Sequence, residues 1–170
     1  QREITHPHKR LQHLVGRYLL KHLFPDFPYD EILIADTRKP YLPYEQYHFS
    51  ISHCGDYAAA IVSKENRVGI DIEIPTSKVL KIAHKFLSEK EREKFESSVE
   101  LTTLLWCCKE TMYKWWGWGE VDFSKMLQLD YFEFKKSGTI SSFFVRNEIN
   151  QALELKYKMF PNLCMAYVVS

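Results

Sequence analysis

The spacing of apolar residues along the chain predicts three longer helices and a series of short strands. Apolar positions recur every three or four residues over 8–24, 78–87 and 97–116, which is the pattern of helices with one buried face. Strands are predicted where apolar positions alternate with polar ones or form short runs, at 48–52, 57–63, 68–74, 129–136, 139–146, 152–160 and 163–169.

Polar residues at the ends of these segments predict where the segments start and turn. Ser88 and Glu91 have the spacing of a capping box for a short helix, and Ser97 with Glu100 has the same spacing at the start of the long helix. Ser137-Gly138 has the composition of a turn between two strands. Helices mixed with antiparallel strands indicate the α+β fold class.

Composition narrows the class of protein. The 170 residues are 45% hydrophobic and 15% aromatic, which indicates a folded globular chain with one sizeable core or two small lobes. A formal net charge of +1 argues against a nucleic acid or a membrane surface bound through bulk electrostatics. No apolar run approaches the roughly 20 residues of a membrane span, and no signal-peptide pattern opens the chain.

The four cysteines lack C-x-x-C spacing, and two of them are adjacent on a predicted helix. A disulfide framework or a zinc site is therefore not expected, and a reducing cytoplasm fits free thiols. The chain begins at Gln1 instead of methionine, from which we expect that a leading segment is missing.

The first stretch with chemistry is the strand predicted at 68–74. Branched apolar residues alternate there with polar ones, which places Asp71 and Glu73 side by side on the face opposite the core. Such acids most often form a solvated outer face. Two adjacent carboxylates are also the hard oxygen ligands that Mg²⁺ prefers.

The second stretch lies on the long helix. Trp106, Glu110 and Lys114 recur every four residues, so their side chains share one stripe of that helix. Pairs of lysine and glutamate on a helix usually lie on the solvent-exposed surface and have no further role. If the helix meets the acidic strand, however, three carboxylates and one ammonium group converge, which is an arrangement that suits Mg²⁺ together with phosphate oxygens.

G-I-D-I-E at 69–73 followed by W-C-C-K-E-T-M-Y-K at 106–114 resembles the paired signature of the 4′-phosphopantetheinyl transferases. The resemblance implies an enzyme that moves 4′-phosphopantetheine from coenzyme A to a serine of an acyl or peptidyl carrier protein and releases adenosine 3′,5′-bisphosphate. The place of the acidic motif near the middle of the chain resembles the larger, surfactin-synthetase-activating type. That type implies a monomer of two similar lobes in a pseudo-twofold arrangement.

Each lobe of such a monomer is a small antiparallel sheet packed on helices. We expect an N-terminal lobe at 1–75, lacking its first segment, a C-terminal lobe at 76–170, and the active site at their interface. In this family the resemblance also implies a cytoplasmic enzyme of fatty-acid or secondary-metabolite biosynthesis, with coenzyme A as donor substrate and Mg²⁺ as cofactor.

The same resemblance assigns roles within the two motifs. It implies that Asp71, Glu73 and Glu110 bind Mg²⁺, and that Asp71 or Glu110 helps to take the proton of the carrier serine. Lys114 matches the lysine that holds phosphate oxygens and completes the catalytic set, and Lys109 is the other basic residue of the motif. Both lysines are therefore expected to contact the cofactor.

Further contacts to coenzyme A are implied outside the two motifs, at Arg10, Lys39, Pro40, Ser52 and His53. Ser52 and His53 belong to an S-I-S-H run that resembles a phosphate-contacting segment, although a histidine that ends a strand is usually structural. Lys39 and Pro40 resemble a G-K-P turn in which Arg38 replaces the glycine. Arg10 matches an arginine for the 3′-phosphate, but it has the plainer interpretation of a solvent-facing helix charge.

The carrier protein is expected to dock on apolar surface beside the metal. Trp115, Trp116 and Trp118 are many large rings for so short a stretch, so at least one should be exposed, while a core position is expected for Trp115. Two alternatives remain open. The chain could be an inactive module that binds coenzyme A or a carrier, or an unrelated Mg²⁺-dependent phosphohydrolase.

Overall fold

The computed structural model describes residues 7–170, so the expectation about the start of the chain lies outside it. Its helices are α1 (Pro7–Leu23), α2 (Lys78–Phe86), α3 (Glu89–Lys94), α4 (Val99–Trp116) and α5 (Phe123–Met126), with a 3-10 turn at Tyr29–Glu31. Its strands are β1 (Leu33–Ile34), β2 (Pro40–Tyr41), β3 (His48–Cys54), β4 (Tyr57–Ser63), β5 (Val68–Glu73), β6 (Leu127–Leu129), β7 (Ser137–Arg146), β8 (Ile149–Phe160) and β9 (Leu163–Val169).

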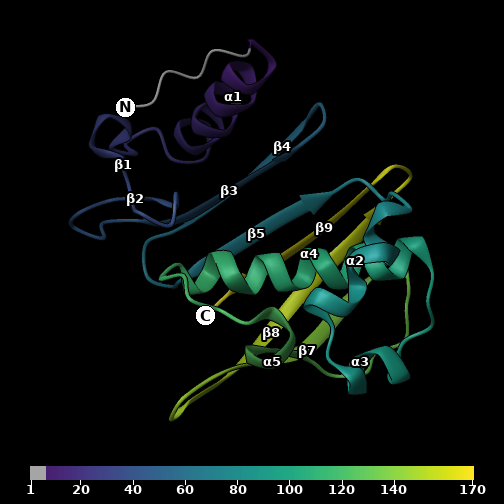
Figure 1. Cartoon of the computed structure of the whole chain (residues 1–170). Helices are drawn as coiled ribbons and strands as arrows, with labels where there is room; N and C mark the ends of the chain where they lie inside the picture. The colour runs from purple at the N-terminus through teal and green to yellow at the C-terminus, as the bar shows by residue number, and fades with distance from the viewer. Residues whose placement is uncertain (1–6) are drawn as a thin grey trace.

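All strand pairs are antiparallel, which confirms the α+β class. The largest sheet has the order β5-β9-β8-β7-β6, while β3 pairs with β4 and β1 with β2 in separate two-stranded sheets. By hydrogen bonding, β5 thus belongs to the sheet of the C-terminal part, although the division expected at residue 75 would place it in the N-terminal lobe. Figure 1 shows α4 lying across one face of this sheet, with α1 and the β3–β4 hairpin beyond β5.

The β3–β4 hairpin contacts β5 through side chains. The hydroxyl oxygens of Ser50 and Ser52 on β3 accept hydrogen bonds from the backbone N–H groups of Ile70 and Ile72, both at 3.2 Å. These bonds occupy the side of β5 that faces away from β9. The acidic strand therefore lies between the hairpin and the larger sheet, in contact with both.

Helix α4 is enclosed on most sides. Its predicted apolar stripe is buried as expected, and the helix packs against β5, β9 and α2. At Gly69 on β5 a Cβ atom would collide with the carbonyl oxygen of Thr111, so the absence of a side chain lets the helix backbone come close to the acidic strand. The predicted capping box at Ser97 is wrong by one residue, because Ser98 is the N-cap and accepts from the N–H of Leu101. The box at Ser88 and Glu91 is confirmed.

The strand predicted at 129–136 ends at Leu129, and the predicted Ser137-Gly138 turn is part of β7. The reason lies in the aromatic residues of the connecting segment. Phe132 packs against the rings of Phe95 and Tyr157, and the Tyr157 hydroxyl accepts a hydrogen bond from the N–H of Lys135 at 3.1 Å. Asp130 still donates its N–H to the carbonyl oxygen of Ser141 on β7, and the segment then crosses the end of β8, where the N–H of Met159 donates to the carbonyl oxygen of Lys136.

Two hydrophobic clusters flank the acidic strand. The larger lies between α4, α2 and the five-stranded sheet, and the smaller lies between α1, the segment after it and β3. No helix within residues 7–170 is both long enough and apolar enough to cross a lipid bilayer.

Candidate active site

A cavity of about 520 Å³ opens where the N-terminal elements meet β5 and α4. Its wall contains Asp71 and Glu73 from β5 and Glu110 and Lys114 from α4. The predicted meeting of the acidic strand with the charged stripe of the long helix is therefore present. The alternative of two separate solvated faces does not hold for these residues.

Asp71 is the most buried of the acids, with 3% of its surface exposed. Its Oδ1 accepts hydrogen bonds from the Ser52 hydroxyl at 2.8 Å and from the Lys114 ammonium at 2.6 Å. Its Oδ2 is buried and is the only buried side-chain nitrogen or oxygen atom without a hydrogen-bond partner in the described residues 7–170. A buried anionic oxygen without a partner carries a desolvation cost that a cation would offset.

Glu73 is held by two donors at the edge of the cavity. The indole N–H of Trp106 donates to Oε1 at 2.9 Å, and the Cys54 thiol lies 3.6 Å from Oε2. Burial, and next the charge of Asp71, raise the pKa of Glu73 above its ordinary value. The two carboxylates of β5 are thus close enough to repel each other.

Glu110 faces the same acids from the helix. Burial, and next the negative charge of Asp71, raise the pKa of Glu110 to about 7, while the positive charge of Lys114 opposes the shift. A carboxyl group with a pKa near neutrality can both accept and release a proton under physiological conditions. Without a bound metal ion, Glu110 therefore exchanges its proton near neutral pH.

The segment Thr37–Pro40 forms another part of the cavity wall. Lys39, Pro40 and His53 line the same cavity as the carboxylates, as the sequence predicts. Arg38, which stands in place of the family's glycine, has φ 66°, so the turn keeps a conformation that glycine adopts more easily. Burial, and next the charge of Arg67, lower the pKa of Lys39 to about 8.

Three residues predicted to contact the cofactor, Ser52, Arg10 and Lys109, do not have the surroundings expected of such contacts. Ser52 lines the cavity, but its hydroxyl proton is donated to Asp71. Arg10 is exposed on α1 and is not among the residues that line the cavity, whereas Arg17 and His13 of the same helix are. His13 and Arg17 lie three and seven residues after Arg10, so they share its helix face. This spacing could have identified them from the sequence.

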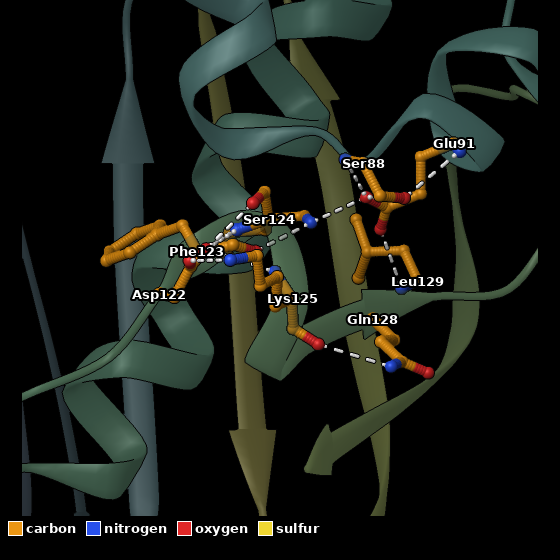
Figure 2. A network of polar contacts seen from close by, with 9 residues as sticks. Ser88, Glu91, Asp122, Phe123, Ser124, Lys125, Gln128 and Leu129 are labelled. Carbon is orange, nitrogen blue, oxygen red and sulfur yellow. Dashed lines mark hydrogen bonds and ion pairs between the residues drawn. The ribbon is translucent and has the colours of Figure 1, made fainter. Parts of the chain in front are cut away.

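Lys109 does not contact the cavity. Its side chain is fully buried, and its ammonium donates to Glu91 Oε2 at 2.8 Å and to the carbonyl oxygen of Phe123 at 3.0 Å. Glu91 also accepts from the N–H groups of Ser88 and Leu129, and Figure 2 shows this network. The interpretation of Lys109 as a cofactor contact is therefore wrong, because the ammonium joins α4 to α3 and to the start of α5.

The three carboxylates have the chemistry to bind a divalent cation, although they are not arranged as a metal site in this structure. No group of three or more His, Cys, Asp or Glu side chains within residues 7–170 has the arrangement of a metal site. The unpartnered Oδ2 of Asp71, with Glu73 and Glu110 on the same cavity wall, nevertheless forms an oxygen-rich set of hard donors. These residues fit Mg²⁺, because a cation would offset the desolvation cost of the buried, unpartnered Oδ2 of Asp71.

The sequence matches that of known proteins over a part of the chain that includes β5 and α4. The model of the 4′-phosphopantetheinyl transferase superfamily matches residues 67–168. A protein of Haemophilus influenzae named putative 4′-phosphopantetheinyl transferase is 30% identical over 130 residues, which cover 71% of this chain and 55% of that protein.

Two further relatives have more specific names. The L-aminoadipate-semialdehyde dehydrogenase-phosphopantetheinyl transferase of Xenopus laevis is 27% identical over 118 residues, or 61% of this chain and 39% of that protein. Enterobactin synthase component D of Escherichia coli is 39% identical over 66 residues, or 38% of this chain and 31% of that protein. The chain thus spans about half of the length of these relatives or less.

Proposed function

Because the chain belongs to the 4′-phosphopantetheinyl transferase superfamily, we propose that it transfers 4′-phosphopantetheine from coenzyme A to a serine of an acyl or peptidyl carrier protein. The second product is adenosine 3′,5′-bisphosphate. The observation that carries the proposal is the convergence of Asp71, Glu73, Glu110 and Lys114 on one cavity, with a buried oxygen of Asp71 unpartnered.

Glu110 is the proposed proton acceptor. The serine oxygen forms a bond to the phosphorus beside the pantetheine, and the bond from that phosphorus to the bridging oxygen of the adenosine bisphosphate breaks. The serine proton passes to Glu110, because within residues 7–170 the other two acids, Asp71 and Glu73, already accept hydrogen bonds from side chains. Asp71 is less suited to this role, because Lys114 and Ser52 donate to its Oδ1.

Asp71, Glu73 and Glu110 are the residues that would hold Mg²⁺, which when bound offsets charge on the pyrophosphate oxygens. Lys114 adds a fixed positive charge from α4 beside Asp71. Trp106 and Ser52 keep the carboxylates of Glu73 and Asp71 in place through their hydrogen bonds.

The charged tail of coenzyme A is proposed to lie against the basic part of the cavity wall. Lys39, His53 and Arg17 bring positively charged or chargeable groups to that wall, and Pro40 adds an apolar surface beside them. Localised positive charge is what a 3′-phosphate requires. Arg17 takes the place in this set that we expected for Arg10.

The arrangement of lobes, the oligomeric state and the cellular compartment are also part of the proposal. The hydrophobic clusters on the two sides of the cavity support two lobes with the active site between them, as in the larger type of the family. We propose a monomer that acts in the cytoplasm, where the free cysteines Cys54, Cys107, Cys108 and Cys164 stay reduced.

Intact-mass measurement of an apo-carrier protein tests the function. Incubation with the chain, coenzyme A and Mg²⁺ should add the mass of phosphopantetheine to the carrier, and Glu110→Gln should abolish the addition. Glu100→Gln, at an exposed acid in the first turn of the same helix, is the matched control and should retain activity. Cleavage of coenzyme A without any mass gain on carriers would favour the phosphohydrolase, and binding without cleavage would favour the inactive module.

A further inference from the structure

Helix α4 ends at a glycine, Gly117, and the missing side chain leaves room for another segment. Gly117 is the C-cap of α4 at φ 79°, and its N–H donates to the carbonyl oxygen of Tyr113 at 3.0 Å. This left-handed conformation favours glycine, but asparagine also adopts it at modest cost. Conformation alone therefore does not explain why a residue without a side chain stands here.

The second reason is space. A Cβ atom on Gly117 would lie 2.6 Å from Nζ and 2.9 Å from Cδ of Lys39, and one on Gly119 would lie 2.9 Å from the methyl carbon of Thr37. The Thr37 hydroxyl also donates to the carbonyl oxygen of Gly117 at 3.3 Å. The segment Thr37–Lys39 thus rests directly on the backbone of residues 117–119.

This contact joins two parts of the cavity that are distant in the sequence. Lys39 and Gly117 both line the cavity that holds the carboxylates, and both also line a neighbouring cavity of about 570 Å³. The turn that carries Lys39 closes on itself through hydrogen bonds between Ala35 and Lys39 and between Arg38 and Ala35. The turn meets the end of α4 at the contacts with residues 117–119.

We propose that Gly117 and Gly119 form a seat for Thr37 and Lys39, which fixes the Lys39 ammonium at a set place relative to Glu110 and Lys114. The two glycines are positioning residues: they act through Lys39, and they let one polyphosphate meet Lys39 and the charges of α4 together. The proposal deepens the proposed function, because the polyphosphate is that of coenzyme A. The seat itself can be tested without that function.

A double-mutant cycle of Gly117→Asn and Lys39→Ala separates the seat from backbone strain. Asparagine tolerates the backbone conformation, and the group it strikes is the far end of a flexible side chain, so the variant should fold. We expect Gly117→Asn to weaken coenzyme A binding about tenfold in calorimetry when Lys39 is present, and to have no further effect in the Lys39→Ala background. Equal weakening in both backgrounds would overturn the proposal, since backbone strain would then explain it.

A second readout does not depend on coenzyme A. The pKa of Lys39, followed by NMR of isotopically labelled lysine, should rise from about 8 towards its ordinary value of 10.5 when Gly117→Asn pushes the ammonium into water. An unchanged pKa would overturn the seat. A raised pKa with unchanged coenzyme A affinity would leave the seat standing and remove its part in coenzyme A binding.

The contact between Gly119 and Thr37 gives a rescue test. Gly119→Asn should weaken coenzyme A binding through collision with the Thr37 methyl group. Thr37→Ser removes this methyl group but keeps the hydroxyl that donates to Gly117, so the double variant should recover affinity. Failure of Thr37→Ser to restore binding would contradict the proposed role of Gly119.

Discussion

Trp106 and Glu73 are joined across the contact between α4 and β5, where the indole N–H donates to Oε1 at 2.9 Å. The indole itself is held between two rings, with Phe86 at 5.0 Å and Phe123 at 5.5 Å between centroids. The carboxylate on the strand is thus oriented by an aromatic side chain whose own freedom is small. Two motifs that are more than thirty residues apart in the sequence depend on each other at this point.

We predict that Trp106→Phe will weaken divalent-cation binding several-fold while retaining the fold. Phenylalanine keeps the contacts with Phe86 and Phe123 but removes the donor, which should lower the free energy of unfolding by about 1 kcal/mol. Manganese titration followed by electron paramagnetic resonance measures the affinity. Trp118→Phe, at an exposed ring, is the control and should bind as the wild type does.

Glu110 should make stability depend on pH. Its pKa is about 7 in the folded chain against an ordinary 4.5, so the folded chain retains a proton that the unfolded chain has lost between these values. The free energy of unfolding therefore falls as the pH rises from 4.5 to about 7. In metal-free buffer, Glu110→Gln should be more stable than the wild type by about 3 kcal/mol at pH 8 and equal to it below pH 4.5. Urea unfolding at several pH values measures the difference, and one that stays constant with pH would contradict the assignment.

Lys39→Ala should weaken binding of coenzyme A by about tenfold and that of dephospho-coenzyme A by much less, because only the former carries a 3′-phosphate. The pKa of about 8 adds a pH dependence. Affinity of the wild type should fall as the pH rises through 8, since the amine loses its charge, and Lys39→Ala should lack this fall. Equal losses for both ligands would show that Lys39 does not contact that phosphate.

Lys109→Met should act on folding and not on coenzyme A. The variant leaves the buried Glu91 without its charged partner, which typically costs about 3–5 kcal/mol. Lys125→Met on nearby α5 breaks an exposed pair with Asp122 and should cost less than about 1 kcal/mol. A variant of Lys109 with wild-type stability and lost coenzyme A affinity would restore the interpretation made from the sequence.

Of Trp115, Trp116 and Trp118, we predict that Trp118 contacts the carrier protein. Trp118 is 64% exposed, whereas Trp115 is in the core and Trp116 stacks on Phe144 with 4.4 Å between centroids. Trp118→Ala should therefore raise the KM for the carrier several-fold and leave the KM for coenzyme A unchanged. Trp116→Ala should instead lower the free energy of unfolding. A rise of both KM values in Trp118→Ala would place the carrier elsewhere.

Regular periodicity made much of the fold predictable. The strand at Tyr57–Ser63 and the last strand at Leu163–Val169 have the predicted bounds, and the long helix is misplaced only at its cap. The segment 130–136 resembled a strand because its aromatic residues alternate with polar ones. Its rings pack on the side chains of other elements, and single-residue alternation cannot distinguish such contacts from pairing.

The site was predicted in part for a similar reason. Periods of two and four residues place Asp71, Glu73, Glu110 and Lys114 on defined faces, and these faces do meet. The position of Lys109 could have been questioned, because Leu105 and Met112 lie four residues before it and three after it on a buried face. Its partner Glu91 belongs to a capping box, which gave no indication of a second, long-range contact.

The two serine hydroxyls on β3 also affect the tendency of the chain to aggregate. β5 is an outer strand of its sheet, and an outer strand with free N–H groups invites another chain to add a strand. Ser50 and Ser52 occupy the N–H groups of Ile70 and Ile72 without extending the sheet. The hairpin thus protects against edge-to-edge aggregation, and its loss would turn the strand that carries Asp71 and Glu73 into a template for self-association.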